Sequence, residues 1–436
     1  MTTERYLIAL LICIANAASF GQTLDKQIAS DYAYLESLYL HLHQHPELSF
    51  YEKNTSRRMA EELRQLGFEV TENVGGYGVV AVLQNGKGPT VLVRADMDAL
   101  PVAEETGKPY ASKVTTTDES GRTVGVMHAC GHDVHMTAWV GAARALAALK
   151  QQWKGTLVFI AQPAEERSGG AKAMLAGGLY EKFPLPDYAL AIHVSASLPA
   201  GAVGICSGYT MANVDMVDIT VYGRGGHGAA PHTTIDPVVL AARLILDFQT
   251  IVSREINPTE PAVLTVVAIT FNNKGNVIPN EVKMELTLRS YADEVRNAMI
   301  EKIQRICRGV AASAGLPENM YPKVEVRNES TPSLYNDPAL AERIGRLFKT
   351  VLGEQRVHQV SQVMTGEDFG QYGRTAHKVP ILLYWLGAVD PALLAAAERG
   401  EAPYPSLHNS RFAPLPEPTI KAGVMTMTAA VMELMK

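Results

Sequence analysis

The chain has 436 residues, of which 47% are hydrophobic and 19% are charged. This composition excludes an intrinsically disordered chain, and the length predicts two domains rather than a single core. The formal net charge of -6 at pH 7 disfavours nucleic acid as a partner.

Residues 1–21 have the pattern of a secretory signal peptide. An unbroken apolar run at 7–15 precedes small residues at 17–19, and it is too short for a stable membrane anchor. The alternative is a buried N-terminal helix. We therefore expect a periplasmic or secreted protein. Its mature chain keeps Cys130, Cys206 and Cys307; an odd number does not fit a disulfide framework. We expect the last two to be buried apolar residues.

The first part of the chain alternates apolar runs with helical patterns. Residues 24–70 predict two helices, residues 134–150 predict a third, and four short apolar runs predict strands at 79–83, 90–93, 156–160 and 188–192. This alternation is typical of an α/β fold with a mixed, mostly parallel sheet flanked by helices.

Acidic and imidazole side chains follow these predicted strands. Asp96 and Asp98 follow the second strand, Glu165 and Glu166 the third, and His193 the fourth. Ligands of open α/β sheets bind beyond the carboxyl ends of the strands. We therefore expect these residues to form one site.

A second domain is predicted as an insertion at 213–330. Strands at 214–222, 262–271, 281–290 and 323–327 and helices at 237–256 and 293–314 follow one another in the order β-α-β-β-α-β, which is that of a ferredoxin-like α+β unit. The catalytic domain then comprises 22–212 and 331–436.

The most informative motif places Cys130 and His132 two residues apart at the start of a predicted helix. A lone Cys-x-His is more often a buried thiol beside a surface histidine. Here His128, Asp133 and His135 surround the pair, and a Glu-Glu pair follows downstream. Thiolate and imidazole ligands in this pattern indicate a transition metal site.

Glu165 and Glu166 are the second element of the site. The side chains of adjacent residues diverge, so that one carboxylate can bind a metal while the other acts as a base on a bound water. His193 and His408 are further candidate ligands; each alone is more often a structural histidine, and His193 gains from its position after a strand.

The motifs resemble those of a known family. Residues 94–101, 127–135, 165–166 and 191–194 are similar to motifs of the aminoacylase and carboxypeptidase family of dinuclear metallopeptidases. Within it they resemble the amidohydrolase branch, which includes hippurate hydrolases, N-acyl-amino-acid amidohydrolases and auxin-conjugate hydrolases. The resemblance extends from residue 43 to about 435.

The resemblance implies the roles of the site residues. Two divalent metal ions, with zinc or manganese first and cobalt or nickel also fitting, would be bound by five side chains, namely Cys130, His132, Glu166, His193 and His408. Cys130 would bridge the two ions, and Glu165 would be the general base. Asp98 would not bind a metal itself but would orient the side chains that do. Asp96 is not counted as a ligand, and His128 and His135 are expected to be structural.

The inserted domain resembles the lid or dimerisation domain of the same family. The resemblance implies a homodimer through this domain, in which His227 reaches the active site of the partner subunit and stabilises the oxyanion. It also implies that Asn276 and Arg289 contact the substrate carboxylate, a role that suits the planar guanidinium. Without the resemblance, His227 is a loop histidine and Arg289 a surface cation.

The expected function is metal-dependent hydrolysis of the amide bond of an N-acyl amino acid or related conjugate. A carboxypeptidase or dipeptidase with the same machinery is the nearest alternative. A non-catalytic metal- or ligand-binding protein and a thiol-redox role for Cys130 are alternatives from other classes. One departure from the family is the polar segment at 115–122, which precedes the metal motif and is expected to shape the mouth of the pocket.

Overall fold

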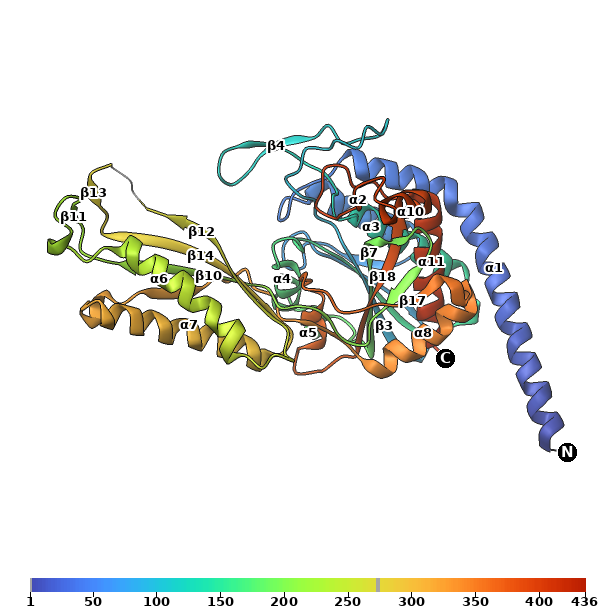
Figure 1. Ribbon diagram of the computed structural model, residues 1–436. Helices are drawn as coiled ribbons and strands as arrows, with labels where there is room; N and C mark the ends of the chain where they lie inside the picture. The colour runs from blue at the N-terminus through green and yellow to red at the C-terminus, as the bar shows by residue number, and fades with distance from the viewer. Residues whose placement is uncertain (1, 272–274) are drawn as a thin grey trace. The chain divides into compact units, whose positions relative to one another are not determined.

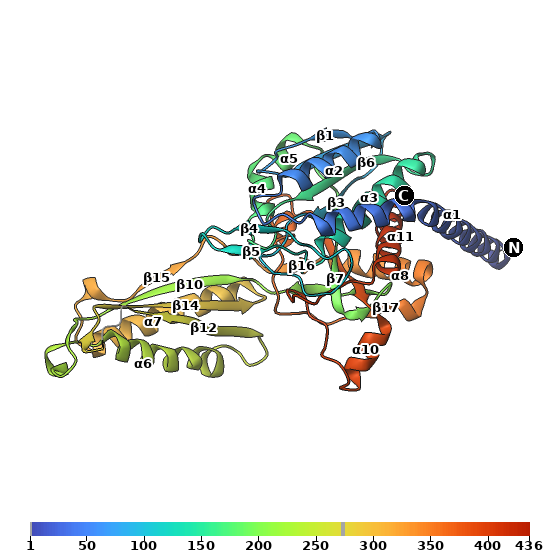
Figure 2. The same ribbon diagram turned by 90° about the horizontal axis from the view of Figure 1, so that it is seen from above.

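The computed structural model describes residues 2–271 and 275–436, with side chains described from residue 23 onward. It divides into two compact units (Figures 1 and 2). The first unit comprises Met1–Gly208, Tyr335–Ser361 and Gln371–Lys436, and the second comprises Tyr209–Leu334 and Gln362–Gly370.

The first unit is built on an eight-stranded sheet with the strand order β1-β2-β6-β3-β7-β18-β8-β17. In that order the strands are Glu69–Thr71, Val79–Asn85, Gly155–Gln162, Thr90–Asp96, Tyr188–Pro199, Ile381–Val389, Val203–Ile205 and Val357–Gln359. The central neighbours β6, β3, β7 and β18 run parallel, whereas β1 and β2 pair antiparallel. The predicted mixed, mostly parallel α/β sheet is therefore confirmed.

Helices pack around this sheet. They are α1 (Thr2–Gln44), α2 (Lys53–Gln65), α3 (His132–Ala148), α4 (Gly170–Ala176), α5 (Leu179–Lys182), α8 (Pro338–Leu352), α9 (Gly370–Gly373), α10 (Pro391–Glu398) and α11 (Pro416–Leu434). Helices α1, α3 and α11 pack against one another (Figure 1). The indole Nε1 of Trp139 donates to the backbone oxygen of Val93 at 3.0 Å. This bond fixes α3 against β3 and thereby positions the residues at the start of the helix.

The predicted signal segment lies in the first half of α1, which continues without a break to Gln44. The side chains of this segment are outside the described residues. Across the residues that were described, no helix has both the length and the apolar character needed to cross a bilayer. Cleavage and export stay predictions.

The second unit has the predicted β-α-β-β-α-β order. Its elements are β10 (Asp215–Tyr222), α6 (Pro237–Thr250), β12 (Ala262–Thr270), β14 (Glu281–Ser290), α7 (Asp293–Ser313) and β15 (Lys323–Val326). The antiparallel sheet has the order β12-β14-β10-β15. Buried residues alternate with half-buried ones along β10 and with exposed or half-buried ones along β14, and α6 and α7 cover one face (Figure 1). The ferredoxin-like arrangement follows from this period-two pattern.

Residues 362–370 correct the predicted domain limits, because they belong to the second unit and not to the catalytic one. The amide of Val363 donates to the oxygen of Thr210, and the amide of Ala212 donates to the oxygen of Thr365. Such backbone pairing across about 150 residues leaves no local pattern in the sequence.

Three helices begin at an Asp-Pro dipeptide, and each aspartate caps the helix. Asp236, Asp337 and Asp390 accept hydrogen bonds from backbone amides of the first turn. Proline follows at the first helical position, where its missing N–H has no partner to lose. These helix starts are therefore encoded locally.

The polar segment that departs from the family pattern forms a β-hairpin. Its strands are β4 (Thr115–Thr117) and β5 (Thr123–Gly125), which pair antiparallel. Short strands β9 (Gly208–Met211) and β16 (Leu334–Asn336) lie at the limits of the two units, and β11 (Gly226–His227) pairs with β13 (Val277–Ile278) inside the second unit.

Candidate metal centre

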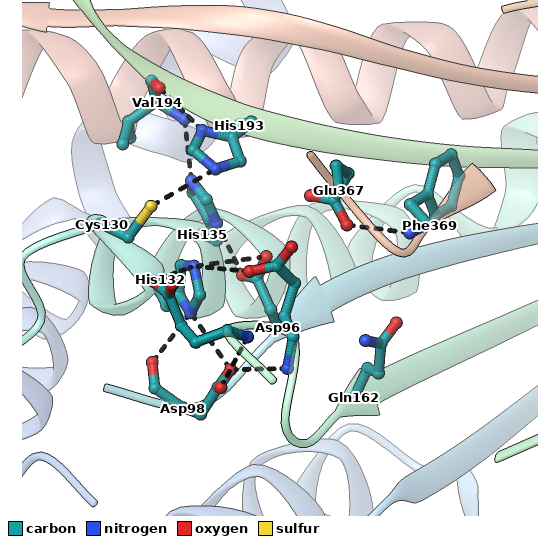
Figure 3. A network of polar contacts seen from close by, with 12 residues as sticks. Asp96, Asp98, Cys130, His132, His135, Gln162, His193, Val194, Glu367 and Phe369 are labelled. Carbon is teal, nitrogen blue, oxygen red and sulfur yellow. Dashed lines mark hydrogen bonds and ion pairs between the residues drawn. The ribbon is translucent and has the colours of Figure 1, made fainter. Parts of the chain in front are cut away.

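The predicted ligands come together at the carboxyl end of the parallel strands in the first unit. Figure 3 shows Cys130, His132 and His193 in one network of polar contacts with Asp96 and Asp98. They come from the end of β3, the loop before α3 and the strand β7. Sequence segments separated by more than 60 residues therefore contribute to one buried site.

A glycine lets the ligand loop approach β7. Gly131 has φ +78, a left-handed conformation that favours glycine, and a Cβ there would lie 2.5 Å from Val194 Cγ2. The close approach puts Cys130 and His132, on either side of Gly131, next to His193. Any larger residue at 131 would push the loop away from the strand.

Cys130 is the common neighbour of two histidines. Its Sγ lies 3.5 Å from Nε2 of His193 and 3.2 Å from Nε2 of His408. His408 has φ +57, and its amide donates to the oxygen of Ala129 at 2.9 Å, which holds its loop beside the Cys130 loop. Thus His408, which had little local support in the sequence, lies at the site.

The position of His193 differs from the sequence expectation. His193 lies within β7 and not after its end, because β7 continues to Pro199 by pairing with β18, where Trp385 is opposite His193. The pairing of β7 with β3 stops at Ala191. His193 consequently lies beyond the end of the neighbouring strand and still faces the site.

Asp98 organises the Glu-Glu pair through its two carboxylate oxygens. Oδ1 accepts the amide of Glu165 at 3.1 Å, and Oδ2 accepts the amide of Glu166 at 3.0 Å. Oδ2 also accepts the hydroxyl of Ser49 at 2.6 Å. The backbone oxygen of Asp98 is 2.8 Å from Nδ1 of His132, so Nδ1 carries the proton and Nε2 is left to bind a metal.

The loop that carries Glu165 is held in a strained conformation. Ala164 has φ +51, which costs a non-glycine residue about 1–2 kcal/mol. Its amide donates to Oε1 of Glu52 at 2.8 Å, and its oxygen accepts the amides of Gly169 and Gly170. These bonds fix the direction in which Glu165 leaves the loop.

Asp96 and His135 are engaged with each other. Nδ1 of His135 lies 2.6 Å from Oδ1 of Asp96, and Nε2 accepts the amide of Val194 at 2.8 Å. The second oxygen of Asp96 accepts from Arg94 at 2.5 Å. Both groups have hydrogen-bond partners, but their donor atoms and those of His132 lie within 4.8 Å of one another, so the expectation that neither is a ligand stays a prediction.

The donor atoms fit two metal ions. One set consists of Cys130, His132 and His193, and another of Cys130, Glu166 and His408; within each set the donor atoms lie within 4.8 Å of one another. Nε2 of His132 and Oε1 of Glu166 are buried and have no hydrogen-bond partner among the described residues. Orphaned buried polar atoms are costly, and cations bound between them would remove that cost. Cys130 is shared by both sets, as a bridging ligand requires.

The charges of the site also call for cations. Burial, together with the carboxylates of Glu166 and Glu165, raises the pKa of the Cys130 thiol well above its ordinary value. Burial likewise raises the pKa of Glu166 and lowers that of His193. Thiolate and carboxylate are the ligand forms, and a bound dication stabilises them.

His128 does not join the site. It is buried, and burial lowers its pKa to about 4. Neither ring nitrogen has a hydrogen-bond partner within the described part of the chain, so its structural assignment has no contact to support it. Cys206 and Cys307 are buried, which confirms that prediction.

The three residues predicted in the inserted domain are divided between its ends. The amide of Gly228 donates to the oxygen of Asn276, and His227 is opposite Val277, so His227 and Asn276 are neighbours. Arg289 lies near the far end of β14, opposite Val263. Eight residues of strand span about 27 Å, so one small ligand cannot touch both groups in a single chain.

Sequence reasoning missed Ser49 and Glu52, which hold Asp98 and the Glu165 loop. Both are polar, and both are buried. No sequence signal pointed to them, because neither lies at a strand end or in a metal-ligand spacing.

The fold and the candidate ligand groups are those of a metal-dependent hydrolase. Comparison with known proteins agrees. The model of peptidase family M20/M25/M40 matches residues 92–433. The chain is 37% identical over 334 residues to hippurate hydrolase of Campylobacter jejuni, covering 76% of this chain and 82% of that protein. It is 34% identical over 388 residues to thermostable carboxypeptidase 1 of Saccharolobus solfataricus, covering 88% and 91%.

A solved structure is similar over nearly the whole chain. The YXEP protein of Bacillus subtilis, a dinuclear metal binding peptidase from the M20 family, superposes with a TM-score of 0.74 at 27% identity and covers 94% of this chain and 100% of that one. The chain therefore belongs to peptidase family M20/M25/M40. The predicted family and enzyme class, a hydrolase of the amidohydrolase and peptidase type, are confirmed.

Proposed function

We propose that the protein is an exported, dinuclear metal-dependent amidohydrolase that cleaves the amide bond of N-acyl amino acids or related conjugates. The observation that carries this proposal is the arrangement around Glu165. This carboxylate lies beside two ligand sets that share Cys130, and two of their donor atoms are buried without a hydrogen-bond partner among the described residues.

The side chains divide the chemistry among them. Two divalent ions at the ligand sets, zinc or manganese by preference, supply Lewis acidity toward the amide carbonyl and toward water. Glu165 is the base and acid: it takes a proton from the attacking water and returns it to the departing amine. Its Oε2 lies 4.0 Å from Nε2 of His132, so it works directly beside a ligand. Asp98 keeps Glu165 in place through its amide.

The carboxylate of the substrate is assigned to Arg289. Its Nη1 is buried and has no partner within the described residues, and burial lowers the pKa of its guanidinium while Asp215 opposes that shift. A substrate carboxylate can pair with the planar guanidinium of Arg289 through charge-assisted hydrogen bonds. Relatives that act on small acyl conjugates, such as the hippurate hydrolase, support this substrate class.

His227 is proposed to stabilise the oxyanion in the partner subunit of a homodimer. The wide separation of His227 and Asn276 from Arg289 along β14 supports contributions from two chains to one site. Mixing Glu165→Gln chains with His227→Ala chains tests this directly. Mixed dimers would contain one intact site and restore about a quarter of wild-type activity; no restoration would refute action across the dimer.

The base assignment is tested with Glu165→Gln. We expect kcat on benzoylglycine to fall by roughly 10²–10⁴-fold, the range of general acid–base catalysis, while the metal content measured by mass spectrometry stays at two ions. Glu181→Gln, an exposed glutamate on α5, is the matched control and should retain full activity. Turnover retained by Glu165→Gln would refute the assignment, and metal lost from it would show that Glu165 is a ligand.

Carboxypeptidase or dipeptidase activity is the second candidate, favoured by the similarity to thermostable carboxypeptidase 1. Comparing kcat/KM for benzoylglycine with that for glycyl-leucine separates the two. Faster turnover of the dipeptide, whose amino end is charged, would replace the amidohydrolase proposal.

A further inference from the structure

A pocket of ≈ 430 Å³ opens beside the metal ligand Glu166 in the first unit. Ser49, the hydrogen-bond donor to Asp98, also lines it. The pocket therefore adjoins the candidate metal centre at Glu166. Its volume lies in the range of small-molecule sites, about 300–1,000 Å³.

The inner wall of the pocket is apolar. Leu48, Ala99 and Leu100 line it, and they come from two segments that are tied together. Leu48 and Ala99 form a parallel bridge, and Leu100 exchanges backbone hydrogen bonds with Met127. This wall is thus a fixed surface beside the ligand loop.

The outer wall is the turn of the β4–β5 hairpin, which departs from the family pattern. Asp118 orders the turn by accepting from the amides of Ser120 and Arg122 at 2.9 Å each and from the Arg122 guanidinium. The base of the hairpin is packed closely, since a Cβ on Gly125 would lie 2.6 Å from Ala103 Cα. The turn is consequently a preformed wall.

An ion pair joins this turn to the loop that carries Glu165 and Glu166. Nη1 of Arg167 lies 3.3 Å from Glu119 Oε2, and Arg167 directly follows Glu166 in the sequence. The other cation of the pocket, Arg122, pairs with Asp118 at 3.0 Å. Because both cations already face carboxylates, the pocket offers an apolar wall and a charge-balanced rim to its occupant.

We propose that this pocket binds the acyl group of the substrate and selects neutral, apolar acyl groups larger than acetyl. The β4–β5 turn is then a specificity-determining element. This inference rests on the proposed function, in which Arg289 binds the substrate carboxylate and the catalytic unit binds the acyl group. The two cations that could hold a carboxylate here, Arg122 and Arg167, already pair with Asp118 and Glu119, which disfavours the amino acid half.

The test compares acetyl-, hexanoyl-, benzoyl- and succinylglycine. Each buried methylene strengthens binding by roughly fourfold, so partial burial of four methylenes predicts a hexanoyl over acetyl ratio in kcat/KM of at least about tenfold. Leu100→Trp fills the pocket and should remove this ratio, because it lowers kcat/KM for hexanoylglycine much more than for acetylglycine. Leu185→Trp, at an exposed leucine outside the pocket, is the matched control and should keep the ratio.

A second variant tests the hairpin. Replacing residues 118–122 by Asn-Gly keeps a two-residue connection between the strands and removes the outer wall. We expect the preference for hexanoyl to fall several-fold in this variant, with acetylglycine turnover maintained. A ratio unchanged in both variants, or a preference of the wild type for acetyl or succinyl, would overturn the proposal.

Binding distinguishes this proposal from the function on which it rests. Hexanoylglycine and acetylglycine are titrated calorimetrically into metal-loaded Glu165→Gln protein, with and without Leu100→Trp. Tighter binding of hexanoylglycine that Leu100→Trp abolishes supports the pocket even if no acylglycine is hydrolysed by the wild type. Equal affinities would refute the pocket even if hydrolysis occurs.

Discussion

Asp98→Asn is the sharpest perturbation of the site, because the substitution preserves shape and changes one acceptor into a donor. In the protein, Oδ1 accepts the amide of Glu165, and Oδ2 accepts the amide of Glu166 and the hydroxyl of Ser49. An asparagine has a single oxygen. In either orientation its NH₂ group faces a backbone N–H that also donates, so at least one buried donor is left unpaired.

The expected size of the effect of Asp98→Asn follows from the number of buried donors that lose their acceptor. A buried unsatisfied donor costs about 1–3 kcal/mol, and a hydrogen bond to a charged acceptor contributes about 1.5–3 kcal/mol. The loop can relieve this cost by moving Glu165 and Glu166. Substitutions behind metal ligands typically lower metal affinity or activity 10–100-fold, and we expect Asp98→Asn to do the same.

The assay measures kcat/KM on an acylglycine together with the dissociation constant of the metal, determined by competition with a chelator. Ser49→Ala is the graded comparison, because it removes one of the three bonds and should have a smaller effect. If Asp98→Asn kept both the metal affinity and kcat/KM within about twofold of the wild type, the role assigned to Asp98 would be refuted.

Three further outcomes are expected. Glu52→Gln keeps an acceptor for the amide of Ala164 and should retain kcat, whereas Glu52→Leu should lower it about tenfold or more by releasing the Glu165 loop; equal kcat values would contradict the positioning role. Burial alone lowers the pKa of His43, but hydrogen bonds to Asp133 and Glu104 raise it to about 10, so its stabilising contribution is present below about pH 6.5 and is lost as the pH rises towards 10. The difference in unfolding free energy between wild type and His43→Gln, from urea titrations, should therefore shrink from pH 6.5 to 10, and a constant difference would argue against this ion pair. Removing metal with a chelator should lower the unfolding temperature, since ligand at a thousandfold excess over its Kd stabilises by about 4 kcal/mol; an unchanged melting curve would argue against metal binding in the folded state.

Many strands and helix starts can be predicted from the sequence, because the patterns that specify them span only a few neighbouring residues. The apolar runs that became β2, β3, β6 and β7 are strands with buried faces, and the short length of such runs together with β-branched residues distinguishes them from buried helices. The Asp-Pro helix starts and the alternation in β10 are equally local. These features depend on neighbours within a few residues, so one chain segment encodes each of them.

The candidate site residues could be nominated for a different reason. Cys130, His132, Glu165 and Glu166 follow strand ends or open a helix, and parallel strands bring such positions to one edge. His408 is the exception, because its contact with Cys130 spans 278 residues. Only its resemblance to a family motif could nominate it, since no local pattern distinguishes it from a loop histidine.

The sequence by itself determined the α/β class, the inserted β-α-β-β-α-β unit and the chemistry of the ligands, because residue type and short-range periodicity carry that information. Only the tertiary structure decided which polar side chains have hydrogen-bond partners within the protein and which segments lie next to the site. It paired Asp96 with His135, placed Ser49 behind Asp98, moved residues 362–370 into the second unit, and set the β4–β5 turn beside Glu166. These outcomes depend on packing between distant segments, where a buried polar atom must find its partner in space and not along the chain.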